Sequence, residues 1–169
     1  DSPSVIYKET PAKAGVGIEN YTWPKPCWAC IQFDIEPRER GFGFQFESAV
    51  GDRVILSRYQ AHIAQTLPGA LKQGLYGWEV TDLKITLTGG SHHLIHTHPL
   101  DFFTATPMAL MNGLENAGCT LLEPMTTLRM SAGGEHAGRL IRDVLAMRGS
   151  FEPPVIHKTE LTMEARVPV

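Results

Sequence analysis

Alternating apolar and polar residues in the first third of the chain predict three β-strands, at 15–22, 27–36 and 43–49. The third strand has a phenylalanine at every second position near its start, as expected for a strand that buries one face. Between the first two strands, residues 23–26 include two prolines, which cannot continue a sheet ladder. A turn is therefore expected there.

Apolar residues three or four positions apart predict two helices in the middle of the chain. The first is expected at 57–73, with Ser57 as its N-cap and its apolar face toward the core. The second should begin at Asp101 or Thr104 and end at Ala117, before a capping glycine. Both helices are long enough to cover one face of a sheet.

The strand expected between these helices, at 78–88, changes its apolar face at Thr81–Asp82. Either a bulge lies there or the two halves bury opposite faces. After residue 118 the pattern predicts a strand at 119–132, a helix at 135–149 and two short strands. A complete split β-α-β domain needs a second helix and a fourth strand, so this last part is expected to be an incomplete domain.

The order of these elements predicts which loops lie together. If successive elements up to residue 118 alternate in direction, every second connection falls at the same end of the domain. One end then collects residues 23–26, 49–57 and 89–101, and the opposite end collects 37–41, 74–77 and 116–119.

Charge and hydropathy narrow the possible partners. The formal net charge of -3 argues against DNA binding by bulk electrostatics, so any contact with nucleic acid has to be local. No apolar run reaches the length of a membrane span, and the first residues have no signal-peptide pattern. A cytoplasmic monomer without a membrane partner is expected.

Three cysteines, an odd number, argue against a disulfide framework. Cys27 and Cys30 form a Cys-x-x-Cys motif, which is also found in redox and zinc sites. Residues three apart in a strand point to opposite faces, with Cα atoms about 10 Å apart, too far for a bridge. Free strand thiols are therefore the preferred interpretation, with a redox or metal role as the alternative.

Four of the seven histidines lie within seven positions, as His92, His93, His96 and His98. Imidazole is a common metal ligand, and three of the four share parity, but the spacing matches no helical His-Glu-x-x-His site. Neighbouring Ser91 suggests a nucleophile, although adjacent residues of an extended chain point apart. A loop that contacts a partner or solvent is the preferred interpretation, and a metal-dependent hydrolase the alternative.

Six stretches of the sequence point to a known family: SVIYKETP, PCWACI, GFGFQFESAV, QGLYGWEVTDLKITL, TPMALMNGLENAGCTLLEP and EHAGRLIRDVLAMRG. Together they resemble the fourth and fifth domains of translation factors related to elongation factor G. Within that superfamily, QGLYGWEVTDLKI and the pairing of VIYKETP with PCWAC are most similar to the tetracycline ribosomal protection proteins. The resemblance covers almost the whole chain, in the same order.

The resemblance implies an α+β fold with two domains. Residues 13–118 would be a β-α-β domain of the elongation factor G domain IV type, with a left-handed crossover. Residues 119–169 would be a partial ferredoxin-like domain V that lacks its second helix and last strand. Residues 1–12 would be the exit strand of a preceding domain, here without its sheet.

The resemblance also implies a function. The intact parent would be a GTPase, with GTP and Mg²⁺ as cofactors, that binds the bacterial ribosome. Its fourth domain would reach small-subunit rRNA near the decoding centre and displace tetracycline. This chain would lack the GTPase domain, so no catalytic residue, metal or cofactor is assigned to it. An elongation factor G-like translocase, or a divergent paralogue, is the second interpretation.

The residues expected to contact the ribosome lie in the loops that the topology brings together: Trp23, Pro24, Lys25, Pro26, Arg53, His92, His93, Leu94, Ile95, His96, Thr97, His98 and Pro99. Prolines would hold the first loop rigid, Trp23 and the imidazoles would stack on bases, and Lys25 would contact phosphate. Packing of Trp23 against the end of the sheet is the alternative. Family members typically have small, tyrosine and proline residues where residues 92–98 are histidine-rich.

Overall fold

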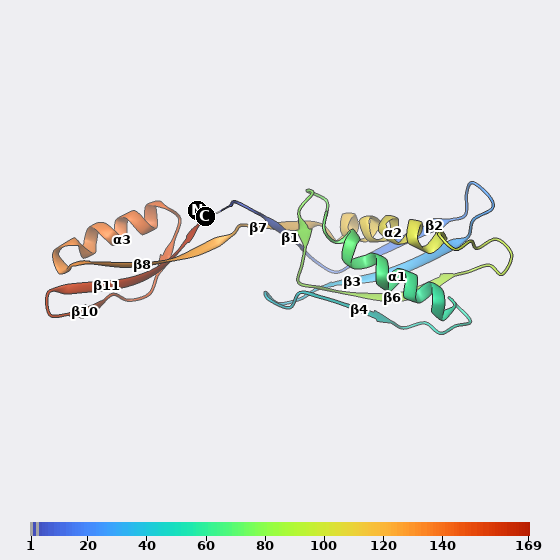
Figure 1. Cartoon of the computed structure of the whole chain (residues 1–169), viewed down its shortest axis with the longest axis horizontal. Coiled ribbons are helices and arrows are strands. Elements are labelled where there is room, and N and C mark those ends of the chain that lie inside the picture. Colours follow the sequence, from blue (N-terminus) through green and yellow to red (C-terminus); the bar gives the residue numbers. More distant parts are fainter. Residues whose placement is uncertain (1, 3) are drawn as a thin grey trace. The chain divides into compact units, whose positions relative to one another are not determined.

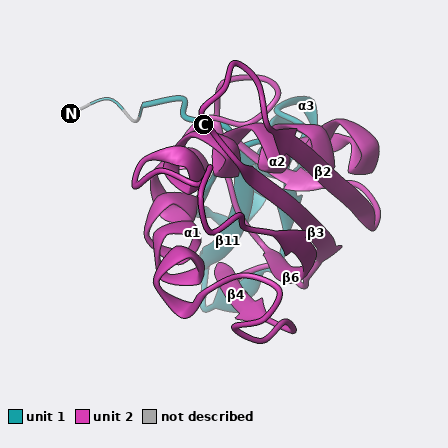
Figure 2. Cartoon of the chain, turned by 90° about the vertical axis from the view of Figure 1, so that its right-hand side faces the viewer, with its two compact units in different colours: residues 1–7, 123–169 teal, residues 8–122 magenta. Residues whose placement is uncertain are grey.

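The computed structural model describes residues 2 and 4–169, which form two compact units. The larger unit comprises residues 8–122, and the smaller comprises 123–169 together with the described residues before Lys8 (Figure 1, Figure 2). The predicted exit strand at 1–12 includes Asp1 and Pro3, which lie outside the described residues.

A four-stranded sheet forms the centre of the larger unit, in the order β2-β3-β6-β4. Its strands are β2 (Gly15–Tyr21), β3 (Ala29–Pro37), β4 (Phe44–Ser48) and β6 (Leu83–Ser91). β3 pairs antiparallel with β2 and with β6, whereas β4 runs parallel to β6. The parallel pair is joined through α1 (Ser57–Ala70), which confirms the expected β-α-β unit. The hand of its crossover stays a prediction.

Helices α1 and α2 (Asp101–Ala117) pack against one face of this sheet (Figure 2). Alternate residues of β3 and β6 point toward the helices, as period-two strands require. The apolar core comprises Ile31, Phe33, Ile35, Leu83, Ile85, Leu87, Tyr59, Ile63, Leu67, Phe102, Leu110 and Leu114. The predicted apolar face of α1 is confirmed, and in α2 the apolar residue Met108 is exposed.

Helix α1 differs from the prediction at both ends. Ser57 is its first residue rather than its cap, and the Ser57 hydroxyl donates to the Asp52 carboxylate. The helix ends at Ala70 instead of residue 73. Pro68 and Gly69 stand in the last turn, where a missing N–H and a flexible backbone favour termination over a kinked continuation. Helix α2 begins at Asp101, the first of the two predicted starts.

A second, smaller sheet lies at the end of the larger unit opposite the loop that precedes α2. β1 (Lys8–Pro11) lies between β5 (Glu79–Val80), to which it is parallel, and β7 (Cys119–Leu122), to which it is antiparallel. The expectation of an exit strand without a sheet is therefore wrong. Glu9 is fully buried in this sheet, and its Oε2 accepts hydrogen bonds from the backbone N–H groups of Tyr76 and Trp78.

The predicted strand at 78–88 is divided between the two sheets. It breaks at Thr81–Asp82, the position at which its apolar face changes. Asp82 has a φ of 59°, and its Oδ1 accepts hydrogen bonds from the N–H groups of Gly41 and Gly43. Asp tolerates this left-handed conformation better than most residues do. The discontinuity was predicted correctly, but its form is a strand break between two sheets.

The smaller unit packs α3 (Ala137–Ala146) on a sheet centred on β11 (Glu160–Pro168). β8 (Met125–Gly133) pairs with one edge of β11, and β9 (Ser150–Phe151) and β10 (Val155–His157) pair with the other, all antiparallel. A short 3₁₀ turn, η1 (Gly134–His136), leads into α3. The order β8-α3-β9-β10-β11 contains the predicted strand, helix and following short strands, and their assignment to a partial ferredoxin-like domain stays a prediction.

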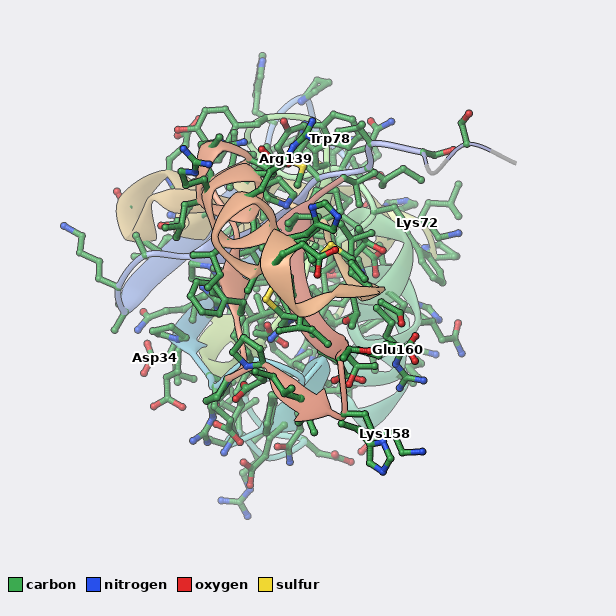
Figure 3. All side chains as sticks on the ribbon, turned by 90° about the vertical axis from the view of Figure 1, so that its left-hand side faces the viewer. Asp34, Lys72, Trp78, Arg139, Lys158 and Glu160 are labelled. Carbon is green, nitrogen blue, oxygen red and sulfur yellow. The ribbon has the colours of Figure 1, made fainter. Side chains whose placement is uncertain are left out.

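The core of the smaller unit is thin. It contains Val144 of α3 and four alternate residues of β11, namely Leu161, Met163, Ala165 and Val167. Leu145 of α3, although apolar, is 57% exposed. Lys158 and Glu160, at the β10–β11 turn, also lie exposed on the surface (Figure 3).

The single strand expected at 119–132 is two strands. Pro124, which cannot donate to a ladder, separates β7 in the larger unit from β8 in the smaller. The two units consequently divide between Leu122 and Glu123, whereas the predicted division was between residues 118 and 119.

Candidate functional site

Three loops meet at one end of the larger unit, opposite the small sheet (Figure 1). We call residues 22–28, 49–56 and 92–100 the tip. His92 Nδ1 lies 3.1 Å from the Val54 carbonyl oxygen, and Thr97 Oγ1 donates to the Trp28 carbonyl oxygen at 2.6 Å. The predicted grouping of these loops is therefore confirmed, while the role of the tip residues stays a prediction.

The first tip loop presents its predicted residues to solvent. Trp23, Pro24, Lys25 and Pro26 are all exposed, and both Xaa-Pro peptide bonds of this segment are cis. Trp23 is 77% exposed, so its packing against the sheet end, the alternative interpretation, is wrong. Immediately after this loop, Cys27 is buried and its thiol donates to the Pro24 carbonyl oxygen at 3.0 Å. Burial, with the Asp101 charge as a second cause, raises the pKa of this thiol.

Trp28 joins two of the loops. Its indole Nε1–H donates to Ser91 Oγ at 3.0 Å, and its ring lies 5.5 Å from the His93 ring. Its backbone N–H donates to Asp101 Oδ2 at 2.9 Å. No local sequence pattern singles out Trp28, because Ser91 and Asp101 are each more than 60 residues away.

The four histidines do not form one cluster. His92 faces α1, with its ring 6.0 Å from that of Tyr59, whereas His93 and His96 have rings 4.4 Å apart on the side of Trp28. His98 Nδ1 lies 2.8 Å from the His96 carbonyl oxygen. The loop is a turn, since Thr97 N–H donates to the His93 carbonyl oxygen, so the parity expected for an extended chain does not apply.

The His93 ring shapes the end of the loop. Its Nδ1 accepts hydrogen bonds from the backbone N–H groups of Ile95, at 3.1 Å, and His96, at 3.2 Å. This geometry requires Nδ1 without a proton. The turn leaves Leu94 and Ile95 at the apex, 87% and 78% exposed. Two aliphatic side chains in water at the end of a loop suit contact with a partner better than they suit a free surface.

Neither a metal site nor a charged patch dominates the tip. Within residues 2 and 4–169, no three His, Cys, Asp or Glu side chains come together in an arrangement that could hold a metal ion. Cys27 and Cys30 are free thiols. Lys25 and Arg53 are exposed, and Asp52 is engaged by Ser57. The tip thus combines a few cations with exposed aromatic and aliphatic groups.

No helix in the described part of the chain is long and apolar enough to cross a membrane.

Comparison with known proteins identifies the relatives of this chain. The family model of elongation factor G, domain IV, matches residues 3–118. The chain is 34% identical to tetracycline resistance protein TetP of Clostridium perfringens over 97% of its length, and 32% identical to TetW of Butyrivibrio fibrisolvens over 98%. It covers about a quarter of those proteins, 25% and 26% respectively.

A solved structure is similar to the whole chain. The crystal structure of a protein from Thermus thermophilus matches it with a TM-score of 0.83 and 27% identity. The match covers 100% of this chain and 26% of that protein.

Proposed function

Because the chain belongs to the elongation factor G domain IV family, we propose that it is the ribosome-contacting end of a tetracycline ribosomal protection protein. Its tip would reach small-subunit rRNA near the decoding centre and displace tetracycline. The parent would be a cytoplasmic GTPase that uses GTP and Mg²⁺, and the chain described here would contribute binding rather than catalysis. Similarity to tetracycline resistance proteins along the whole chain supports protection over other tasks of the family.

The exposed side chains of the tip carry this proposal. Trp23, Leu94 and Ile95 come from two loops at the same end of the unit and are each more than three-quarters exposed. Single-stranded or unstacked rRNA bases offer flat apolar faces, on which aromatic side chains stack with about 1–3 kcal/mol per base. Lys25 and Arg53 would contact phosphates beside these bases.

A translocation factor is the second candidate, because the matching family model is that of elongation factor G. Both candidates require the tip to enter the ribosome. They differ in what the parent does there, so one experiment with two readouts separates them.

The test expresses the full-length parent in a tetracycline-sensitive bacterium. The parent should confer resistance, and Trp23→Ala or a Leu94→Ser, Ile95→Ser double variant should remove most of it. Tyr76→Ala is the matched control, because Tyr76 is 58% exposed but lies at the opposite end of the same unit. It should retain full resistance.

Two results would decide against protection. A wild-type parent that is expressed and folded but gives no resistance contradicts it, and restoration of translocation in a factor-depleted translation reaction would establish the second candidate. If Tyr76→Ala reduced resistance as much as Trp23→Ala did, the tip would have no special role.

A further inference from the structure

Asp101 accepts two backbone hydrogen bonds on one oxygen. Its Oδ2 receives the N–H of His98 at 2.8 Å and the N–H of Trp28 at 2.9 Å. The residue is only 6% exposed, so water competes little for this carboxylate. Hydrogen bonds to an ionised acceptor are shorter and stronger than neutral ones.

Helix capping explains neither bond. Asp101 is the first residue of α2, and its N-cap, Leu100, makes no side-chain capping hydrogen bond. The His98 bond instead closes the turn that leads into the helix. The bond from Trp28 spans 73 residues and belongs to a different loop. It satisfies no group of α2.

Thr97 makes the reciprocal connection. Its Oγ1 donates to the Trp28 carbonyl oxygen at 2.6 Å and accepts from the His93 N–H at 2.8 Å. Together with the Ser91 contact to the Trp28 indole, the N–H, the C=O and the ring of Trp28 are all held by residues of the histidine loop or its ends.

We infer that Asp101 is a positioning residue that, with Thr97 and Trp28, holds the first and third loops of the tip as one rigid body. Trp23 and the apex pair Leu94–Ile95 are then presented to a binding partner in a fixed relation. The claim that the two loops form one rigid body is independent of the proposed function. The claim that they present these side chains to a partner rests on the proposed function.

The connection extends from Trp28 to both contact surfaces. On one side, buried Cys27 donates to the Pro24 carbonyl oxygen, which ties the segment next to Trp23. On the other, the Trp28 ring lies against His93, whose Nδ1 holds the N–H of Ile95 at the apex. Loss of the Asp101 carboxylate therefore loosens both surfaces together.

The structural test measures backbone hydrogen exchange by NMR on the 169-residue chain. In Asp101→Ala, exchange should rise by about tenfold or more at Trp28 and His98 and also at Ile95 and Thr97, which Asp101 does not touch. In Asp101→Asn the rise should be clearly smaller than in Asp101→Ala, because an amide oxygen can accept the same two bonds, although more weakly than a carboxylate.

Asp82→Gly is the matched control. Asp82 is a buried aspartate whose Oδ1 also accepts two backbone N–H groups, at the other end of the unit. Glycine removes this carboxylate without straining the backbone φ of 59°. This variant should accelerate exchange at Gly41 and Gly43 and leave the tip unchanged. Tip exchange raised equally by Asp82→Gly would show global instability and overturn the inference. Unchanged Ile95 and Thr97 in Asp101→Ala would show that the loops move independently, and would also overturn it.

The functional test uses the full-length parent. Asp101→Ala and Thr97→Val should lower tetracycline resistance, and Asp101→Asn should retain it; equal loss in the alanine and asparagine variants would contradict a positioning role. If Trp23→Ala leaves resistance intact, the proposed function fails, whereas the exchange result still decides whether the loops form one body.

Discussion

The ring nitrogens of the tip histidines contact different groups, so residues of the same type have different structural roles. His92 faces the Val54 carbonyl oxygen, His93 accepts two N–H groups, and His98 faces the His96 carbonyl oxygen. The sequence predicted that these histidines lie at a shared end. It could not predict their separate roles, because each role depends on a turn and on the distant residue Trp28.

A residue far from the tip gives a sharp pH prediction. Burial, followed by the charge of Glu9, raises the pKa of the Cys119 thiol to about 11. The unfolded chain should release this proton near the ordinary value of about 8.5, while the folded chain retains it. The stabilisation from this thiol is therefore complete below about pH 8.5 and is lost as the pH rises toward 11.

Alkylation checks this shift. At pH 8, iodoacetamide should modify Cys119 at least about tenfold more slowly in the native chain than in urea, because only the thiolate reacts. The ultraviolet thiolate absorbance that appears near pH 11 should be smaller by the contribution of one thiol in Cys119→Ser. Equal native and unfolded rates would show that the shift does not exist.

At the scale of elements, the backbones of α2 and β2 are in close contact. This contact fixes the position of α2 on the sheet, and with it the end of the tip loop that leads into α2. A Cβ placed on Gly17 would lie 2.2 Å from the Ala109 carbonyl oxygen. Asn112 and Asn116 of α2 bond the Ile18 N–H and the Val16 carbonyl oxygen of β2, which are otherwise open at this sheet edge. Strand periodicity predicted β2 and helical spacing predicted α2, but neither pattern carries information on the distance between them.

Gly17→Ala should destabilise the larger unit by about 1–3 kcal/mol, because the added methyl group meets backbone that cannot move aside cheaply. Gly69→Ala is the matched control, since a Cβ there meets nothing within 4 Å and Gly69 lies in α1. It should be neutral or stabilising by up to about 1 kcal/mol. Urea unfolding followed by circular dichroism measures both, and a neutral Gly17→Ala would contradict the close contact.

Much of the arrangement of helices and strands could be predicted from the sequence. Alternation and helical spacing placed the main strands and both long helices, and the alternation of direction placed the tip. The change of apolar face located the discontinuity at Asp82 but not its form, whereas the break at Pro124 was missed. The division between β7 and β8 depends on β1 as a pairing partner, which local pattern cannot reveal.

At the scale of the whole molecule, the chain covers about a quarter of its tetracycline resistance relatives, and the function proposed for it belongs to a longer parent. Of the features that the proposed function requires, the tip is the one that this chain contains. Its few cations and its exposed Trp23, Leu94 and Ile95 suit base contact more than general attraction to phosphate.

The most direct test is photo-cross-linking from the tip. The full-length parent is bound to bacterial ribosomes with a photoreactive amino acid at position 94, and a second preparation has it at position 76, at the other end of the unit. Cross-links to small-subunit rRNA near the decoding centre from position 94, but not from position 76, are predicted. Absence of small-subunit rRNA cross-links from position 94 in a bound complex would contradict the proposal.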